Sequence, residues 1–148
     1  MSNLSNNFIA GDWVKGSSSI SNINPSDTSD VIGEYAQANN AQLEDALNSS
    51  QIAQKQWAAT GLEQRQAVLM KIGEEMMARS AELGELLSRE EGKPVAEGKG
   101  EIYRAGQFFT YYAAEVLRQS GDTADSVRPN IEIDVRREAM GTVAIISP

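Results

Sequence analysis

The side chains that could do acid–base or nucleophilic chemistry in this sequence are carboxylates, hydroxyls, amines and guanidines, because its 148 residues include no histidine and no cysteine. The commonest general base, the thiol nucleophile and most zinc sites are therefore excluded from this chain. Two adjacent acidic pairs, Glu74-Glu75 and Glu90-Glu91, suggest paired-carboxylate chemistry. Both pairs lie in segments with helical periodicity, where neighbouring residues do not share a face. We interpret them as solvated surface, so the sequence itself supplies no catalytic set.

Composition and charge narrow the class of protein. The chain carries 13 basic and 21 acidic residues, a formal net charge of −8, whereas a nucleic-acid-binding surface needs a basic footprint. No apolar run approaches the roughly 18 residues of a membrane span, and residues 1–7 lack the basic and apolar regions of a secretory signal. Without cysteines, nothing indicates an oxidising compartment. We predict a globular cytoplasmic protein with no nucleic-acid partner and no membrane contact.

Strand signals occupy the first part of the chain. Residues 8–14 place strand formers on both sides of an Ala-Gly-Asp turn and predict a short hairpin. Residues 20–24 predict a short extended segment that stops at Pro25, where a run of turn-favouring residues begins. Residues 31–36 resemble another strand. These signals place β structure ahead of a helical middle.

The helical middle begins with apolar residues at helical spacing over 43–57. Asn39 or Asn40 can cap this first helix. Thr60 and Glu63 match a capping box, which predicts the start of a second helix.

Two further helices complete the middle of the chain. Ser80 can cap the third helix, and Gly92-Lys93-Pro94 ends it, because glycine accepts the left-handed conformation and proline cannot continue a helix. A longer fourth helix is predicted from Val95 to Gln119, stopped by Ser120-Gly121.

The last part of the chain returns to strand signals. A polar loop is expected from Gly121 to Pro129, and residues 131–136 then alternate strictly, as in a half-exposed strand. After Gly141 comes a continuous apolar run, typical of a strand buried on both faces inside a parallel sheet. Parallel strands need neighbours joined by long crossovers. We therefore interpret the chain as α/β and as the opening part of a longer protein, ending where a nucleotide-binding sheet begins.

Five elements in this order resemble the N-terminal segment of the NAD(P)-dependent aldehyde dehydrogenase superfamily. They are an opening hairpin at 8–13, an Asn-Pro turn at 24–27, a Gly-Lys-Pro helix end at 91–94, a Tyr-Tyr-Ala helix at 111–113, and the lead-in Arg137-Glu138, Gly141 and Ile146-Ser147-Pro148. The likeness covers nearly the whole chain, from residue 8 to 148. Two positions depart from the family pattern: Ala139 stands where proline is common, and Ala114 where glycine is common.

The resemblance implies a hairpin and four helices that lead into the first strand of a Rossmann-type parallel sheet. It implies that residues 1–128 are the N-terminal part of the cofactor-binding domain, 129–140 a strand of the oligomerisation sheet, and 141–148 the first buried Rossmann strand, truncated. In such enzymes a cysteine thiolate attacks the aldehyde, hydride passes to NAD or NADP, and a glutamate activates water to hydrolyse the thioester. An asparagine side chain and a backbone N–H stabilise the oxyanion. All of these catalytic residues are expected beyond Pro148.

The resemblance also suggests which residues contact the cofactor and the substrate. Ile146, Ser147 and Pro148 match the strand end beside the ribose and nicotinamide, where ligands of parallel sheets bind, although Ile146 would also suit a core position. Arg104 lies about two helical turns before Tyr111, on a helix that lines the family's substrate tunnel. A guanidinium there can pair with a carboxylate, which favours succinic or 2-oxoglutaric semialdehyde. The alternative is a surface arginine, solvated or paired with Glu101.

An ion site and a subunit contact follow from the same resemblance. Ile23, through its carbonyl, and Glu90 match positions where some relatives hold a monovalent cation, which prefers oxygen ligands. The alternative is that Glu90 is part of a solvated pair at a helix end. Residues Ile131 to Arg136 match a strand of the oligomerisation sheet, and an edge strand seeks a partner. The alternative is an ordinary hairpin with the following segment.

Two other interpretations of the whole chain stay open. It could be a short, non-catalytic interaction module built on the four helices, which would suit the absence of histidine and cysteine. The apolar C-terminal run argues against this, because an unpaired apolar strand promotes aggregation. It could also be a truncated subunit that pairs with the full-length enzyme through residues 131–136.

Overall fold

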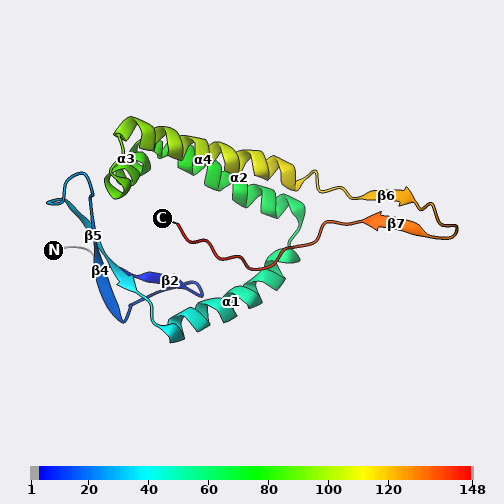
Figure 1. Ribbon diagram of the computed structural model, residues 1–148, viewed down its shortest axis with the longest axis horizontal. Coiled ribbons are helices and arrows are strands. Elements are labelled where there is room, and N and C mark those ends of the chain that lie inside the picture. The colour runs from blue at the N-terminus through cyan, green and yellow to red at the C-terminus, as the bar shows by residue number, and fades with distance from the viewer. Residues whose placement is uncertain (1–3, 148) are drawn as a thin grey trace.

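The structure, a computed structural model, describes residues 4–147. Strands, four helices and a final hairpin follow one another along the chain and form an open ring with a projecting arm (Figure 1). The α/β class predicted from the sequence is confirmed, with β elements on both sides of a helical middle. No helix within residues 4–147 is both long and apolar enough to cross a membrane.

A three-stranded sheet forms one side of the ring. Strand β5 (Val31–Gln37) lies at its centre, parallel to β1 (Leu4–Ser5) and antiparallel to β4 (Ser18–Ile23). The turn between β4 and β5 closes through the Asn24 N–H, which donates to the Asp30 carbonyl at 3.0 Å. The strand predictions for 20–24 and 31–36 are therefore confirmed, with Asn24 itself in the turn.

The predicted hairpin at 8–14 is confirmed as β2 (Asn7–Ile9) and β3 (Asp12–Val14). Its two-residue turn places Ala10 at φ 55° and Gly11 at φ 94°, the positive values that tight hairpins need. Phe8 and Trp13 face each other across the two strands, with ring centroids 5.0 Å apart.

Helix α1 (Asn40–Ala58) is capped by Asn39, one of the two residues predicted for this role. The Asn39 Oδ1 accepts from the Gln42 N–H at 2.9 Å, and Gln42 Oε1 accepts from the Asn39 N–H at 3.1 Å, which completes a capping box. The prediction that Thr60 caps α2 (Leu62–Ala78) is wrong, because the cap position is Gly61. The Thr60 hydroxyl donates backwards to the Trp57 carbonyl at 2.6 Å and satisfies the end of α1 instead.

Helix α3 (Ser80–Glu91) follows α2 with no loop between them, so the predicted Ser80 cap is also wrong. Arg79 occupies the junction, and its N–H still donates to the Glu75 carbonyl at 2.9 Å. Its guanidinium bridges Glu75 on α2 and Glu82 on α3, at 3.3 and 2.8 Å. The predicted end of α3 is confirmed, with Gly92 left-handed at φ 74°.

Helix α4 (Val95–Val116) packs against α2 and α3 and ends one turn before the predicted Gln119. Glycines let the helices approach closely: a Cβ added at Gly106 would lie 2.7 Å from the Gly73 carbonyl oxygen. Ala113 and Val116 are the buried apolar residues among those described, and α1 has no buried residue. The ring therefore encloses no complete hydrophobic core of its own.

The arm is an antiparallel hairpin of β6 (Asp122–Asp125) and β7 (Glu132–Val135), which projects away from the ring (Figure 1). The strand predicted at 131–136 is confirmed over four of its residues. The polar loop predicted from Gly121 to Pro129 is wrong over β6. The sequence of β6 contains few strand-forming residues, so it did not predict a strand, and β6 forms because it pairs with β7. The partner of β7 is therefore β6, which precedes it in the sequence, and not the segment that follows it.

Residues 137–147 are extended but make no strand pairing in the described part of the chain, so the strand expected from Gly141 does not form here. Ile145 is 88% exposed and Ile146 95% exposed, whereas the sequence pattern predicted burial on both faces. The physical reason is that a strand is defined by its neighbour, and no described strand lies beside this one. Pro148 lies outside the described residues.

Candidate functional site

The exposed face of α4 gathers one arginine and several aromatic side chains. Positions 104, 108, 111 and 112 share a face at helical spacing, and the rings of Phe108, Tyr111 and Tyr112 are 56%, 58% and 58% exposed. The Arg104 guanidinium carbon lies 5.8 Å from the centre of the Phe108 ring. This distance is within the range of a cation–π contact between the guanidinium and the Phe108 ring.

Arg104 has no carboxylate partner among residues 4–147. Its Nη1 donates to the neutral side chain of Gln107 at 3.2 Å. The partner considered from the sequence, Glu101, instead accepts from Lys93, which also contacts Glu91 at 2.5 Å. These contacts raise the pKa of Lys93, first through Glu101 and then through Glu91. The charge of Arg104 is therefore not neutralised by its own helix.

A cavity of about 450 Å³ lies at the carboxyl end of this face. Tyr111 and Tyr112 form one wall, with the two rings edge to face at 5.2 Å. Arg137, on the segment after the arm, lines the same cavity and brings a second guanidinium toward the aromatic face. A third guanidinium, that of Arg118, forms an ion pair with Glu115 at 2.7 Å.

The predicted ion ligands lie close to a contact between β4 and α3. The Asn22 side chain donates to Glu90 Oε1 at 2.7 Å, which brings this carboxylate to the strand that ends at Ile23. No cluster of three acidic, histidine or cysteine ligands occurs in the described residues, so any ion here would depend on carbonyl oxygens as well. The ion site itself stays a prediction.

The predicted cofactor contacts, Ile146 and Ser147, lie exposed near the end of the extended segment. Their backbone groups make no hydrogen bond to other described residues. The cofactor contact of these residues stays a prediction. Pro148, the third predicted contact, is outside the described residues.

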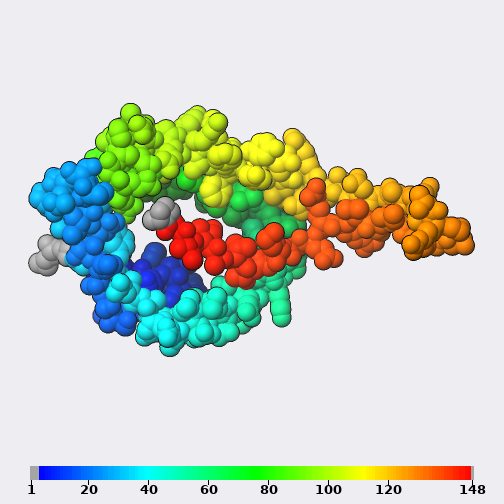
Figure 2. Space-filling view, in the orientation of Figure 1, coloured from blue at the N-terminus to red at the C-terminus, as the bar shows by residue number. Residues whose placement is uncertain are grey.

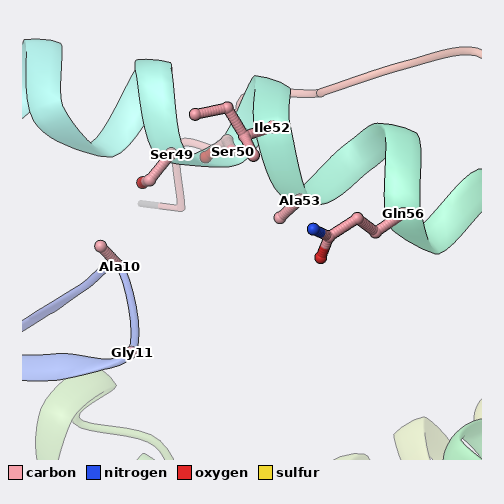
Figure 3. A pocket seen from close by; sticks show the side chains of 7 residues that line it. All are labelled: Ala10, Gly11, Ser49, Ser50, Ile52, Ala53 and Gln56. Atoms are coloured by element: carbon pink, nitrogen blue, oxygen red, sulfur yellow. The ribbon is translucent and has the colours of Figure 1, made fainter.

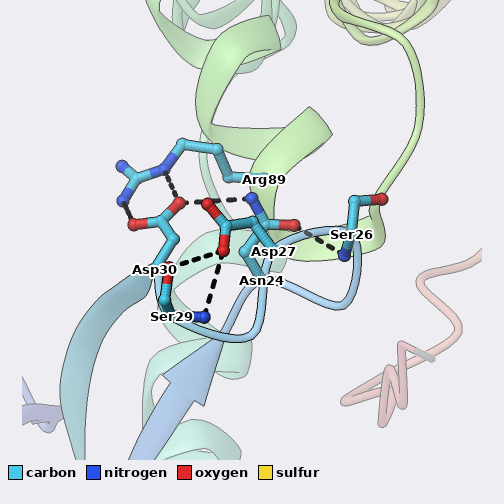
Figure 4. A network of polar contacts seen from close by, with 6 residues as sticks. All are labelled: Asn24, Ser26, Asp27, Ser29, Asp30 and Arg89. Atoms are coloured by element: carbon cyan, nitrogen blue, oxygen red, sulfur yellow. Dashed lines mark hydrogen bonds and ion pairs between the residues drawn. The ribbon is translucent and has the colours of Figure 1, made fainter.

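A polar cluster that the sequence did not predict closes the ring between the β4–β5 turn and α3 (Figure 4). Arg89 binds Asp30 with both Nε and Nη2, at 2.8 and 2.6 Å, and Asn24 donates to the same carboxylate at 3.2 Å. These hydrogen bonds, Arg89 first, hold the pKa of Asp30 at about 2. The Ser26 hydroxyl donates to the Gly92 carbonyl at 2.9 Å. We call this set of contacts the latch.

An open pocket of about 380 Å³ separates the β2–β3 turn from α1 (Figure 3). The hydroxyl protons of Ser49 and Ser50 are engaged within α1, because both groups donate to the Ala46 carbonyl, at 3.0 and 2.6 Å. The other lining residues are apolar or neutral, namely Ala10, Gly11, Ile52, Ala53 and Gln56. The pocket therefore offers no reacting group, and the chemistry-bearing surface of this chain is the α4 face.

These elements make up an α/β segment with a β region, a helical layer and a projecting arm. The sequence model of the aldehyde dehydrogenase family matches residues 13–148, and the chain belongs to that family. The resemblance inferred from the sequence motifs is thus confirmed.

Three similar proteins illustrate the match. An α-ketoglutaric semialdehyde dehydrogenase of Bacillus subtilis is 32% identical over 96% of this chain and 30% of its own length. A vanillin dehydrogenase of Corynebacterium glutamicum is 36% identical over 95% of this chain and 29% of its own length. The crystal structure of an NAD-dependent benzaldehyde dehydrogenase from Corynebacterium glutamicum superimposes with a TM-score of 0.76 at 32% identity, covering 86% of this chain and 28% of that one. The chain spans less than a third of each relative.

Proposed function

We propose that this chain is the N-terminal part of an enzyme that oxidises a carboxylate-bearing semialdehyde to the dicarboxylic acid with NAD or NADP. The observation that carries the proposal is the exposed Arg104, which has no carboxylate partner among the described residues and lies on the aromatic face of α4. Relatives named for α-ketoglutaric, glutarate and succinate semialdehydes support the same substrate class.

Arg104 would bind the carboxylate at the far end of the substrate from the aldehyde. A guanidinium presents two parallel N–H donors to a carboxylate, and each charge-assisted bond strengthens when water is excluded. The contact with Phe108 limits the side chain to fewer orientations before the substrate arrives, so less entropy is lost on binding. A neutral aldehyde of similar length gains nothing from this charge.

The reaction itself would depend on residues outside this chain. A cysteine would attack the aldehyde carbonyl, and the bound NAD(P) would accept the hydride. Ile146 and Ser147, with Pro148, would contribute packing and main-chain contacts to the cofactor. Their role would be to orient the cofactor and not to exchange a proton.

The substitution Arg104→Ala in the complete enzyme tests the proposal. The expected result is a fall in kcat/KM for succinic or 2-oxoglutaric semialdehyde of about 10- to 100-fold, carried mainly by KM, because one charge-assisted contact is lost. The kcat/KM for neutral aldehydes should change little. Arg128→Ala, which removes an exposed arginine at the tip of the arm, is the matched control. Equal losses for acidic and neutral aldehydes would count against the proposal.

An aromatic aldehyde is the second candidate substrate. The exposed rings of Phe108, Tyr111 and Tyr112 favour it, and so do the vanillin and benzaldehyde dehydrogenases among the similar proteins. Aromatic rings stack with offset or edge-to-face geometry, which this face can supply. A higher kcat/KM for benzaldehyde than for succinic semialdehyde would select this candidate.

The remaining assignments are proposed together. Residues Ile131 to Arg136 would join another subunit, since Ile131, directly before β7, and Ile133 and Val135 within it lie half-exposed at alternate positions of an isolated hairpin. Such a hairpin is marginally stable alone, so a partner sheet would stabilise it. Ile23 and Glu90 would hold a monovalent cation, and the enzyme would work in the cytoplasm.

A further inference from the structure

Lys93 lies in the turn between α3 and α4 and contacts a carboxylate on each helix. Its ammonium is 2.5 Å from Glu91, the last residue of α3, and it also donates to Glu101 in the second turn of α4. The turn holds the lysine in place, because Gly92 is left-handed at φ 74° and Pro94 occupies the cap position of α4. The Lys93 side chain is only 21% exposed. Glu101 is therefore bound by a cation from outside its own helix.

Glu101 is also spaced along α4 to contact Arg104, three residues further on. Residues at this spacing face each other on a helix, and oppositely charged pairs form there. The same order, with the glutamate first, gives an ion pair at the end of α4, where Glu115 and Arg118 are 2.7 Å apart. Arg104 makes no such contact within residues 4–147, and its Nη1 donates to the neutral Gln107 instead. One of two equivalent spacings is therefore paired and the other is not.

The two glutamates differ in the other cations that they contact. Glu115 contacts no cation besides Arg118 in the part of the chain that the structure describes, whereas Glu101 contacts Lys93. Glu101 is 55% exposed, and α4 (yellow-green to yellow) lies along the rim of the ring in the space-filling view (Figure 2). Ion pairs in such a wet setting are weak. A single competing ammonium is thus enough to decide which cation Glu101 holds.

We infer that Lys93 is a positioning residue, which holds Glu101 so that the Arg104 guanidinium stays free for the carboxylate of the substrate. Without Lys93, Glu101 would pair with Arg104, and the substrate would have to displace it. This inference rests on the proposed function and deepens it. Lys93 becomes a determinant of affinity for acidic aldehydes, although it would not touch the substrate itself.

The kinetic test is Lys93→Met in the complete enzyme, alone and combined with Glu101→Gln. The single variant should raise the KM for succinic semialdehyde about two- to fivefold, the effect of one exposed ion pair that competes with the substrate. Its kcat and its KM for a neutral aldehyde should change little. The double variant should regain the wild-type KM, because no carboxylate is left to pair with Arg104. A raised KM that Glu101→Gln does not restore would overturn the inference, since a damaged turn would behave in that way.

Two further variants separate the position of the charge from its presence. Lys93→Arg keeps a cation between the two glutamates and should leave the KM for succinic semialdehyde close to the wild-type value. Lys99→Met is the matched control, because it removes the same charge from an exposed position of α4 that has no ion pair within residues 4–147. An equal rise in KM for Lys99→Met and Lys93→Met would reduce the effect to net charge and overturn the inference.

A crystal structure of the Lys93→Met enzyme without substrate tests the positioning role independently of the reaction. The Arg104 guanidinium should lie within about 4 Å of the Glu101 carboxylate, the distance of an ion pair. A guanidinium that stays beside Gln107 would overturn the inference. Equal losses in Arg104→Ala for acidic and neutral aldehydes would instead overturn the proposed function. A selective loss in Arg104→Ala with an unchanged KM in Lys93→Met would overturn the role of Lys93 alone.

Discussion

Arg89 and Asp30 are 59 residues apart in sequence, and the guanidinium of one meets both carboxylate oxygens of the other, at 2.6 and 2.8 Å. The pair joins α3 to the turn between β4 and β5. Together with the Asn22–Glu90 and Ser26–Gly92 contacts, it holds the sheet against the helical layer. The ring is thus closed by polar contacts rather than by a shared apolar core.

The latch should depend on pH in a defined direction. The folded pKa of Asp30 is about 2, below the ordinary value of 3.8, so its contribution to stability is complete above pH 3.8. The contribution is lost as the pH falls through about 2. The melting temperature of Asp30→Asn should therefore lie below that of the wild type by a constant amount between about pH 5 and 7, and the gap should close on acidification.

Thermal melts of both proteins from about pH 7 down to about pH 2 check the prediction. Asp45→Asn, at an exposed position of α1 with no ion pair in the described residues, is the matched control. If the difference in melting temperature between the wild type and Asp30→Asn is unchanged at about pH 2, the charge of Asp30 does not contribute to stability.

Close packing between α2 and α4 should make two glycines of one helix respond in opposite ways to alanine. A Cβ at Gly106 would lie 2.6 Å from Met77 Cγ and 2.7 Å from the Gly73 oxygen, so Gly106→Ala should destabilise the fold by about 1–3 kcal/mol. Gly100 has open space around it, and Gly100→Ala should stabilise α4 by about 0.5–1 kcal/mol. Urea unfolding followed by circular dichroism measures both, and equal effects of the two substitutions would contradict the packing argument.

The capping box of α1 should contribute measurably to stability. Asn39→Ala removes the side-chain acceptor for the Gln42 N–H and should cost about 1 kcal/mol. Asn40→Ala, one residue further on, removes no hydrogen bond from the described structure and should lie within about 0.5 kcal/mol of the wild type. Chemical denaturation of the two variants side by side tests this. A larger loss of stability from Asn40→Ala than from Asn39→Ala would show that Asn39 is not the capping residue.

Local signals predicted local structure well. The Asn39 cap, the Ala10-Gly11 turn and the Gly92 helix end each depend on neighbours within four residues, and all three are present. The caps predicted at Thr60 and Ser80 failed for a related reason. The Thr60 hydroxyl bonds back to the end of α1, and the Arg79 N–H bonds back to α2, so that α3 begins directly after α2 without a Ser80 cap.

Non-local structure left no readable signal in the sequence. Arg89 and Asp30 are an ordinary arginine and aspartate until the ring brings them together. Strand β6 has the sequence Asp-Thr-Ala-Asp, which favours a turn, and it becomes a strand through pairing with β7. Of the candidate site, the α4 face followed from helical spacing, whereas the occupation of Glu101 by Lys93 could not be predicted, because it depends on how α4 begins after Pro94.

The latch also has a consequence for the order in which the chain folds. Its Arg89–Asp30 and Ser26–Gly92 contacts join residues that are 59 and 66 positions apart, and the neighbouring Asn22–Glu90 contact joins residues 68 apart, whereas α2, α3 and α4 pack with much nearer neighbours. Loop closure of this length costs entropy before any contact stabilises it, so the helical layer should assemble first and the ring should close late. Substitutions in the latch should then accelerate unfolding and leave the folding rate almost unchanged.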